Sequence, residues 1–392
     1  MRPDTSTGDG RIAIDPGEEQ TMTARAAAAI PIARPQIGED EAQQVLEVLR
    51  SGLLVAGRRV AAFEEAFARY VGAPYAVATS SGSAALHVAL AALGVGPGDR
   101  VVTTPLSFGA TSHAVLHVGA EPVFADVDPA TGNLDPNAVE PLLRRGRIRA
   151  ILIVHLYGLP ADAPAFADLA ARYGAFLVED CAQAHGAAVG GRRVGTFGDA
   201  AIFSFYPTKN MTTGEGGMLL VRDADVARRA RLLVDPRGEQ EYTYEVVGYN
   251  FRMTEMAAAI GLVQLRHLEA RNAVRRANAR RLHDGLADLS WLRVPVEPAG
   301  FHHVYHQYTV QVPGVRDALA HHLAAAGVET RVYYPRLIPD TPAYRRRGFG
   351  GTFPHAHRLT QEVLSLPVHP GLSADDLGTI VAAVRAFAGG AG

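Results

Sequence analysis

Cysteine, lysine and long apolar runs are scarce in this chain of 392 residues. Its single cysteine, Cys181, excludes an internal disulfide and fits a reducing compartment, so we expect a cytoplasmic protein. No run of about 18 uncharged apolar residues occurs, so we expect no membrane-spanning helix. The pattern of a secretory signal peptide is missing as well.

An excess of charge of either sign is also missing. The 38 basic and 40 acidic residues give a formal net charge of −2 and are mixed along the sequence. This balance gives no electrostatic reason to expect nucleic acid or an anionic membrane as a partner. Apolar residues, in contrast, make up 48% of the chain, which is enough for a substantial core and more than one lobe.

The first 30 residues differ in composition from the rest. Residues 1–20 are rich in Gly, Asp, Thr and Glu, and residues 24–29 form a small low-complexity stretch. We therefore expect a disordered leader over residues 1–30 and leave it out of the fold prediction.

Short β-rich runs and helical stretches alternate along the chain after Pro74. The expected strands are Tyr75–Thr79, Arg100–Thr104, Pro122–Asp126, Ala150–Leu156, Phe176–Glu179, Ala200–Phe205 and Gly217–Val221. Helices such as Ser83–Leu93 and Ala163–Tyr173 separate several of these strands. This alternation predicts an α/β fold with a mainly parallel sheet covered on both faces.

The pattern changes near Glu255, where a long helix rich in Ala, Arg and Leu is expected to run to about Leu286. The elements expected beyond it are a strand at Tyr305–Val312 and helices at Val315–Ala326 and Ala374–Ala388. We therefore predict a large domain over residues 31–254 and a smaller α+β domain over residues 255–392.

Four segments of the large domain place polar groups just past the C-terminal ends of expected strands, where parallel sheets bind ligands. In the first, Thr79-Ser80-Ser81-Gly82-Ser83-Ala84, a strand runs into a Ser/Gly turn and a helix begins at once. The N–H groups of Ser83 and Ala84, the Ser83 hydroxyl and the helix dipole would form an anion site suited to a phosphate. Taken alone, the pattern is more simply an ordinary serine N-cap.

In the second segment, the apolar run Phe176–Val178 leads through Glu179 to Asp180, and Gln183 follows three residues later. A carboxylate placed under a pyridine nitrogen keeps that nitrogen protonated, which makes the ring an electron sink. Gln183 could then contact the phenolic oxygen of the same ring. A helix N-cap by Asp180 is the simpler explanation when this segment is considered alone.

The third segment, Ser204-Phe205-Tyr206-Pro207-Thr208-Lys209, contains a lysine in a loop between two strands, followed by a glycine-rich turn. Almost all other basic residues of the chain are arginine, which cannot form a Schiff base because its pKa leaves no free nucleophilic nitrogen. An ordinary surface lysine is the alternative, and the first two segments make it the weaker interpretation.

The fourth segment, Gly248-Tyr249-Asn250-Phe251-Arg252, places an amide and a guanidinium just ahead of the long helix, for which Thr254 is the expected N-cap. A metal centre is not expected. His302, His303 and His306 lie close together in the sequence, but no paired carboxylate or cysteine accompanies them, so a polar strand edge is the better interpretation.

Taken together, the four segments resemble the DegT/DnrJ/StrS family of aminotransferases over residues 32–388. The motifs that carry the resemblance are Ser81–Leu86, Glu179–Gly186, Ser204–Lys209 and Gly248–Arg252. The resemblance implies the fold of pyridoxal-5′-phosphate (PLP) enzymes of the aspartate-aminotransferase type (fold type I).

The resemblance also implies a role for each matching residue. Lys209 would hold PLP as a Schiff base and move the proton during catalysis. Asp180 would pair with the pyridine nitrogen and Gln183 with the phenolic oxygen. The remaining cofactor contacts implied by the family are Gly82, Ser83, Ala84 and Ser204 around the phosphate, Phe108 stacked on the ring, and Asn250 reaching the cofactor of the neighbouring subunit in a homodimer with shared sites.

The activity that the resemblance implies is transfer of an amino group from an amino acid, expected to be L-glutamate, to a ketone of a nucleotide-linked sugar. Arg252 and Tyr334 are the candidate substrate contacts. The family often has a histidine in the late stretch Tyr333–Pro339, where this chain has Ile338, so the acceptor could instead be a cyclitol or another natural-product ketone. A sugar dehydratase would replace Lys209 by histidine, and a non-catalytic PLP-binding regulator would not need Lys209, Asp180 and Gln183 together.

Overall fold

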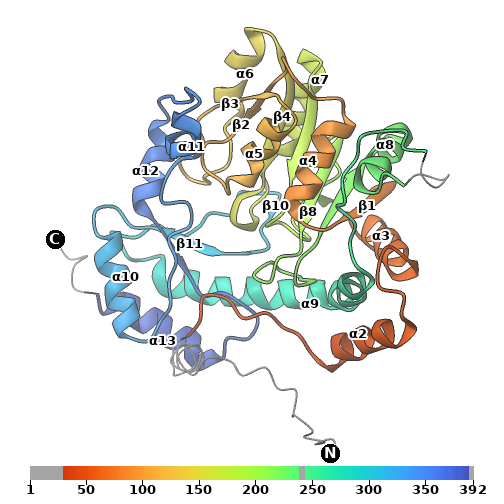
Figure 1. Ribbon diagram of the computed structural model, residues 1–392. Coiled ribbons are helices and arrows are strands. Elements are labelled where there is room, and N and C mark those ends of the chain that lie inside the picture. Colours follow the sequence, from red (N-terminus) through yellow and green to blue (C-terminus); the bar gives the residue numbers. More distant parts are fainter. Residues whose placement is uncertain (1–29, 238–242, 388–392) are drawn as a thin grey trace, which may run out of the picture.

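The computed structural model describes residues 30–237 and 243–387 and is built around a seven-stranded sheet (Figure 1). The strands, in their order across the sheet, are β1 (Tyr75–Thr79), β9 (Gly217–Val221), β8 (Ala200–Ser204), β5 (Phe176–Asp180), β4 (Ile148–Val154), β2 (Arg100–Thr103) and β3 (Glu121–Phe124). Strand β9 is antiparallel to both β1 and β8, and the other neighbours are parallel. The mainly parallel sheet predicted from the sequence is confirmed, and all seven strands lie within two residues of their expected bounds.

Helices cover both faces of the sheet, because the strands are apolar on both sides. In β4, Leu152 belongs to the core under one layer of helices, whereas Ile151 and Ile153 belong to the core on the opposite face. The first face is covered by α4 (Gly82–Ala92), α5 (Ala110–His117) and α8 (Ala224–Val234). The second is covered by α3 (Arg58–Val71), α6 (Pro136–Arg144) and α7 (Ala163–Tyr173).

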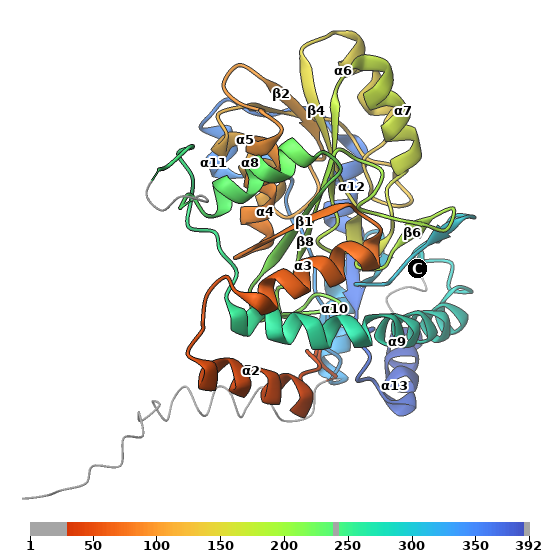
Figure 2. The ribbon, with the colours of Figure 1, turned by 90° about the vertical axis from the view of Figure 1, so that its right-hand side faces the viewer.

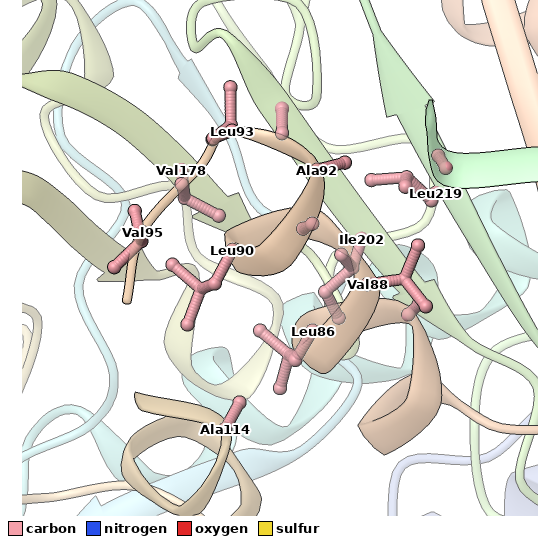
Figure 3. Packing of buried hydrophobic residues seen from close by; sticks show 14 of the residues in the cluster. Leu86, Val88, Leu90, Ala92, Leu93, Val95, Ala114, Val178, Ile202 and Leu219 are labelled. Atoms are coloured by element: carbon pink, nitrogen blue, oxygen red, sulfur yellow. The ribbon is translucent and has the colours of Figure 1, made fainter. Parts of the chain in front are cut away.

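Helix α4 is the central helix of its layer and is apolar on nearly all sides. Figure 3 shows Leu86, Val88 and Leu90 packed among side chains of the sheet and of α5, and each is at most 2% exposed. Burying such a side chain contributes about 1.5–3 kcal/mol relative to leaving it in water. This packing fixes the N-terminus of α4 at the carboxyl edge of the sheet.

The long helix α9 (Glu255–Leu286) begins at the expected N-cap, Thr254, whose hydroxyl accepts the N–H of Ala257. Its first turn is tied to α3, because the Glu255 carboxylate accepts the main-chain N–H groups of Gly57, Arg59 and Val60. The first part of α9 lies beside α3 and α2 (Glu39–Ser51), as Figure 2 shows.

The last part of α9 packs in a second core with the antiparallel strands β11 (Tyr308–Gln311) and β12 (Val363–Leu366). The helices of this core are α10 (Arg316–Ala325) and α13 (Ala374–Arg385). The smaller elements are η1 (Leu156–Gly158), β6 (Ala188–Val189), β7 (Arg192–Arg193), β10 (Phe301–His302), η2 (Ile338–Asp340), α11 (Pro342–Arg345) and α12 (Pro354–Glu362). Because α9 belongs to both cores, the boundary at residues 254/255 stays a prediction.

Ile30 joins this second core, and its N–H donates to the Gly327 carbonyl. The leader expected over residues 1–30 otherwise lies outside the described residues. Over the described ranges, no helix is both long and apolar enough to cross a membrane.

Candidate active site

The candidate site lies at the edge of the sheet where β1, β8 and β5 end. Gly217, the first residue of β9, pairs with both Thr79 of β1 and Ser204 of β8. The turn that follows β1 and the loop that follows β8 therefore leave the sheet side by side, and Asp180 ends β5, the next strand along. Three of the segments singled out from the sequence thus meet at one edge.

Two glycines allow the start of α4 to pack against this edge. A Cβ on Gly82 would come 2.7 Å from Cβ of Ser204, and a Cβ on Gly217 would come 2.4 Å from the Ser81 carbonyl oxygen. Side chains at either position would push the helix N-terminus away from Ser204. Close approach of the main chain, rather than an unusual φ, is the reason for glycine here.

Ser81 caps α4, since its hydroxyl accepts the N–H of Ala84 at 3.1 Å. The N–H of Ala84, expected from the sequence to face an anion, therefore already has a partner. Ser83 is exposed in the first turn of the helix, where the main-chain N–H groups and the helix dipole favour a negative charge.

Asp180 is buried, and both of its carboxylate oxygens have donors. The Thr111 hydroxyl donates to Oδ2 at 2.9 Å and the Ala182 N–H donates to Oδ1 at 3.1 Å. Burial raises the pKa of the Asp180 carboxyl, while these two hydrogen bonds and the nearby Lys209 lower it. Thr111 was not singled out from the sequence, because nothing in its position in α5 signals that it faces Asp180.

Lys209 is the only lysine of the sequence. Loss of solvation lowers its pKa from the ordinary value to about 8, and the carboxylate of Asp180 opposes that shift. Burial, with Lys209 as a nearby positive charge, also lowers the pKa of His185 to about 3 and that of His306 well below its usual range. The Lys209 amine therefore lies near imidazoles that are uncharged, and the carboxylate of Asp180 is the negative charge that acts on it.

Gln183 is held in a fixed orientation. Its Oε1 accepts the N–H of Tyr157 at 2.6 Å, and its Nε2 donates to the Tyr334 hydroxyl at 2.6 Å. Tyr334, expected as a substrate contact, is thus joined to a residue expected to contact the cofactor. Its pKa is raised by burial, and Asp180 is among the charges that act on it, so its hydroxyl stays protonated at neutral pH.

The remaining expected site residues lie near the start of α4 or on the surface. The Ser80 N–H donates to the Phe251 carbonyl at 2.7 Å, which places the fourth segment beside the first. Asn250 is exposed, and Phe108 has 65% of its surface exposed. Arg252 is paired with Asp235, with Nη1 3.1 Å from Oδ1.

Two of the three histidines considered for a metal, His303 and His306, have hydrogen-bond contacts through their rings. Nδ1 of His303 accepts the N–H of Tyr305, and Nδ1 of His306 lies 3.3 Å from Oδ1 of Asn210. In the described part of the chain, one group has ligand atoms close enough to share an ion, and it consists of His155, Glu179 and Cys181 instead. The Glu179 carboxylate there accepts main-chain N–H groups from three residues of the 195–198 turn, so its role is to fix that turn.

Comparison with known proteins identifies the family of this chain. The model of the DegT/DnrJ/EryC1/StrS aminotransferase family matches residues 35–385. A pleiotropic regulatory protein of Geobacillus stearothermophilus is 40% identical over 87% of this chain and 92% of its own length. UDP-N-acetyl-3-dehydro-α-D-glucosamine 3-aminotransferase of Acidithiobacillus ferrooxidans is 40% identical over 86% of this chain and 91% of its own.

The solved structure of S. venezuelae DesV in complex with a ketimine intermediate superposes with a TM-score of 0.85 at 37% identity, covering 94% of this chain and 96% of that one. The chain belongs to the DegT/DnrJ/EryC1/StrS aminotransferase family and is an aminotransferase.

Proposed function

We propose that this aminotransferase uses PLP to move an amino group from L-glutamate to a ketone of a nucleotide-linked sugar. The observation that carries the proposal is the meeting, at one edge of the sheet, of the only lysine, a buried carboxylate and the N-terminus of α4. These are a carbonyl-binding amine, a partner for a pyridinium and an anion site, which PLP requires together.

The residues present fit PLP. Gly82 and Ser83 at the start of α4 would hold its phosphate together with Ser204, which the glycine at position 82 brings close. Asp180 would meet the pyridine nitrogen, and Gln183 the phenolic oxygen. Phe108, a largely exposed aromatic ring beside the site, is suited to stack on the cofactor ring.

When bound, PLP supplies an electron sink that stabilises negative charge at Cα of the donor amino acid. Asp180 would keep the pyridine nitrogen protonated, and the hydrogen bond that Thr111 donates to Oδ2 lowers the pKa of Asp180 against the effect of burial. Nζ of Lys209 would take the proton from Cα of the donor and deliver it to C4′ of the cofactor. With a pKa of about 8, Lys209 has an appreciable neutral fraction near pH 7, as a general base needs.

The acceptor is proposed from the Acidithiobacillus relative, which is named as an aminotransferase of a UDP-linked 3-dehydro sugar. Tyr334 is the substrate contact that the geometry favours, because it is bonded to Gln183. A cyclitol or another natural-product ketone is the second candidate. It is favoured by Ile338, which is 4% exposed and offers no polar side chain where the family often has histidine.

We further propose that the active unit is a cytoplasmic homodimer with shared sites. The exposed Asn250 would reach the phosphate of the partner subunit's cofactor. Large apolar side chains are exposed around the end of α2, as expected for a surface that a second copy covers. These side chains are Leu46, Leu49, Leu53, Leu54 and Val55.

Borohydride reduction tests the cofactor. Wild-type protein should be yellow, lose its long-wavelength absorbance on reduction and retain the cofactor after denaturation, attached to a single peptide containing Lys209. Lys209→Ala should retain none, and its continued attachment at another position would contradict the proposal. The acceptor is tested by incubation with glutamate and a panel of nucleotide-linked ketosugars and cyclitol ketones, with the aminated product measured by mass spectrometry.

A further inference from the structure

A small hollow beside Lys209 is lined by positively charged side chains and by no acidic residue. Its cationic lining residues are Arg34, Lys209, Arg271 and Arg275, and its polar uncharged ones include Thr208 and Asn210. Four cations around one hollow without a carboxylate in its wall create a positive potential that attracts anions. Lys209 and the residues of its loop line the hollow, so an anion held there lies beside that lysine.

Among these cationic residues, Arg275 is buried and has no carboxylate partner in the described part of the chain. It is 6% exposed, and its guanidinium bonds only two main-chain carbonyls, those of Tyr305 and His306, each at 3.3 Å. Its Nε has no hydrogen-bond partner among the described residues, and no carboxylate there lies within ion-pair distance of it. Burial and the nearby Arg271 lower its pKa to about 10.

Three other arginines near the site each have a carboxylate nearby. Arg276, the next residue of α9, pairs with Glu297 at 2.7 Å, and Arg252 pairs with Asp235 at 3.1 Å. Arg271 lies 3.8 Å from Glu41. A buried charge without a counter-ion is costly. Its presence beside Lys209 therefore indicates a ligand that supplies the negative charge.

We propose that this hollow binds one carboxylate of the amino donor, with Arg275 as its main ligand and Arg34 at its mouth. This inference rests on the proposed function. It explains how the enzyme would select a dicarboxylic amino acid as the amino donor. The guanidinium fork suits a carboxylate in two parallel hydrogen bonds. The hollow is small, with about 20 Å³ of space for water-sized groups, which suits the end of a single carboxylate.

The test uses glutarate, a dicarboxylate without an amino group, as a probe that binds without reacting. Titration calorimetry on the PLP-loaded protein should show glutarate binding to wild type and at least a 30-fold weaker binding to Arg275→Met, because truncating one partner of a buried charge pair costs several kcal/mol. The concentration of glutamate that half-converts the long-wavelength band should rise by a similar factor. Arg275→Lys should recover part of both.

Arg276→Met is the matched control, because it removes a neighbouring arginine of the same helix that already has a carboxylate partner. Its glutarate affinity should stay within threefold of wild type. Arg275→Met should fold with an unchanged or higher Tm, since it removes an uncompensated buried charge. If it does not fold, Arg275→Gln, which can still donate to the two carbonyls, takes its place.

The outcomes separate this inference from the proposed function. Equal glutarate and glutamate affinities in wild type and Arg275→Met would overturn the carboxylate site and leave the aminotransferase proposal intact. If no amino acid converts the long-wavelength absorbance band of the wild-type protein, the proposed function is wrong. The glutarate titration would still show whether the hollow binds a carboxylate. If UDP binding depends on Arg275 and glutarate binding does not, the site serves a diphosphate and the inference is wrong.

Discussion

The hydroxyl of Thr111 donates to Oδ2 of Asp180 across a distance of 2.9 Å, although the two residues are 69 positions apart in the sequence. This bond joins helix α5 to the end of β5 and supplies one of the two donors that stabilise the Asp180 carboxylate in its buried position. Thr111 is therefore a positioning residue for the carboxylate that we propose meets the pyridine nitrogen.

Thr111→Val removes this hydrogen bond while keeping the shape of the side chain. Because the bond lowers the pKa of Asp180, its loss raises that pKa, and the acidic limb of the pH–activity profile should move to higher pH. A hydrogen bond to a charged group is worth about 1.5–3 kcal/mol, so the movement should be about one to two pH units. Thr111→Ser should restore the wild-type limb.

Ser112→Ala is the control for this variant. Ser112 is the next residue of the same helix, but its hydroxyl lies 2.7 Å from the Tyr344 hydroxyl and does not contact Asp180. Its pH profile should match wild type. An unchanged acidic limb in Thr111→Val would show that the hydrogen bond does not set the ionisation of Asp180.

The single lysine makes the pKa of Lys209 directly measurable. Protein labelled with ¹⁵N-lysine has one side-chain resonance, and in the cofactor-free form it should titrate near pH 8. In urea it should titrate at about 10.4, the value for an exposed lysine. In Asp180→Asn the pKa should fall further below 8, because the carboxylate raises it. A folded-state value near 10 would contradict the loss of solvation at Lys209.

Gly82→Ala tests the close packing of α4 on Ser204. The added Cβ would meet Cβ of Ser204 at 2.7 Å, so the helix N-terminus must shift away from the site. Overpacking of this kind costs roughly 1–3 kcal/mol, and PLP affinity, followed by absorbance during titration, should fall about 5- to 100-fold. Gly378→Ala in α13, where no atom lies within 4 Å of the new Cβ, should leave PLP affinity unchanged.

The sequence predicted the strands and the three loop segments at the sheet edge because both leave local patterns. Apolar β-rich runs mark the strands, and a Ser/Gly turn before a helix marks the start of α4. The antiparallel direction of β9 was not predicted, since β8 and β9 carry the same kind of apolar run whichever way they pair. Direction depends on the connecting loop, which runs from Ser204 to Gly217 without a helix.

Residues that act through contacts between distant segments left no such pattern. Thr111 and Tyr157 are ordinary helix and loop residues until folding brings them to Asp180 and Gln183. Arg275 belongs to an arginine-rich helix in which only burial separates it from Arg276. The partner of Arg252 likewise became visible only in three dimensions. Local pattern identifies the elements, whereas side-chain partners depend on packing.

The shared site of the proposed homodimer can be tested by complementation. If Asn250 crosses to the partner's cofactor, each site takes Lys209 from one chain and Asn250 from the other. Lys209→Ala lacks the group that bonds the cofactor and moves the proton, and Asn250→Asp sets a carboxylate against a phosphate, so each variant alone should be nearly inactive.

Unfolding and refolding the two variants together in equal amounts should give about half mixed dimers by random pairing. Each mixed dimer then has one site with both defects and one site with neither, so roughly a quarter of the wild-type activity should return. If both residues served the site of their own chain, every site would keep one defect and no activity would return. A mixture shown by differential tagging to contain mixed dimers, yet without activity, would rule out the shared site, because the two intact residues would then be present in one assembly and still fail to act together.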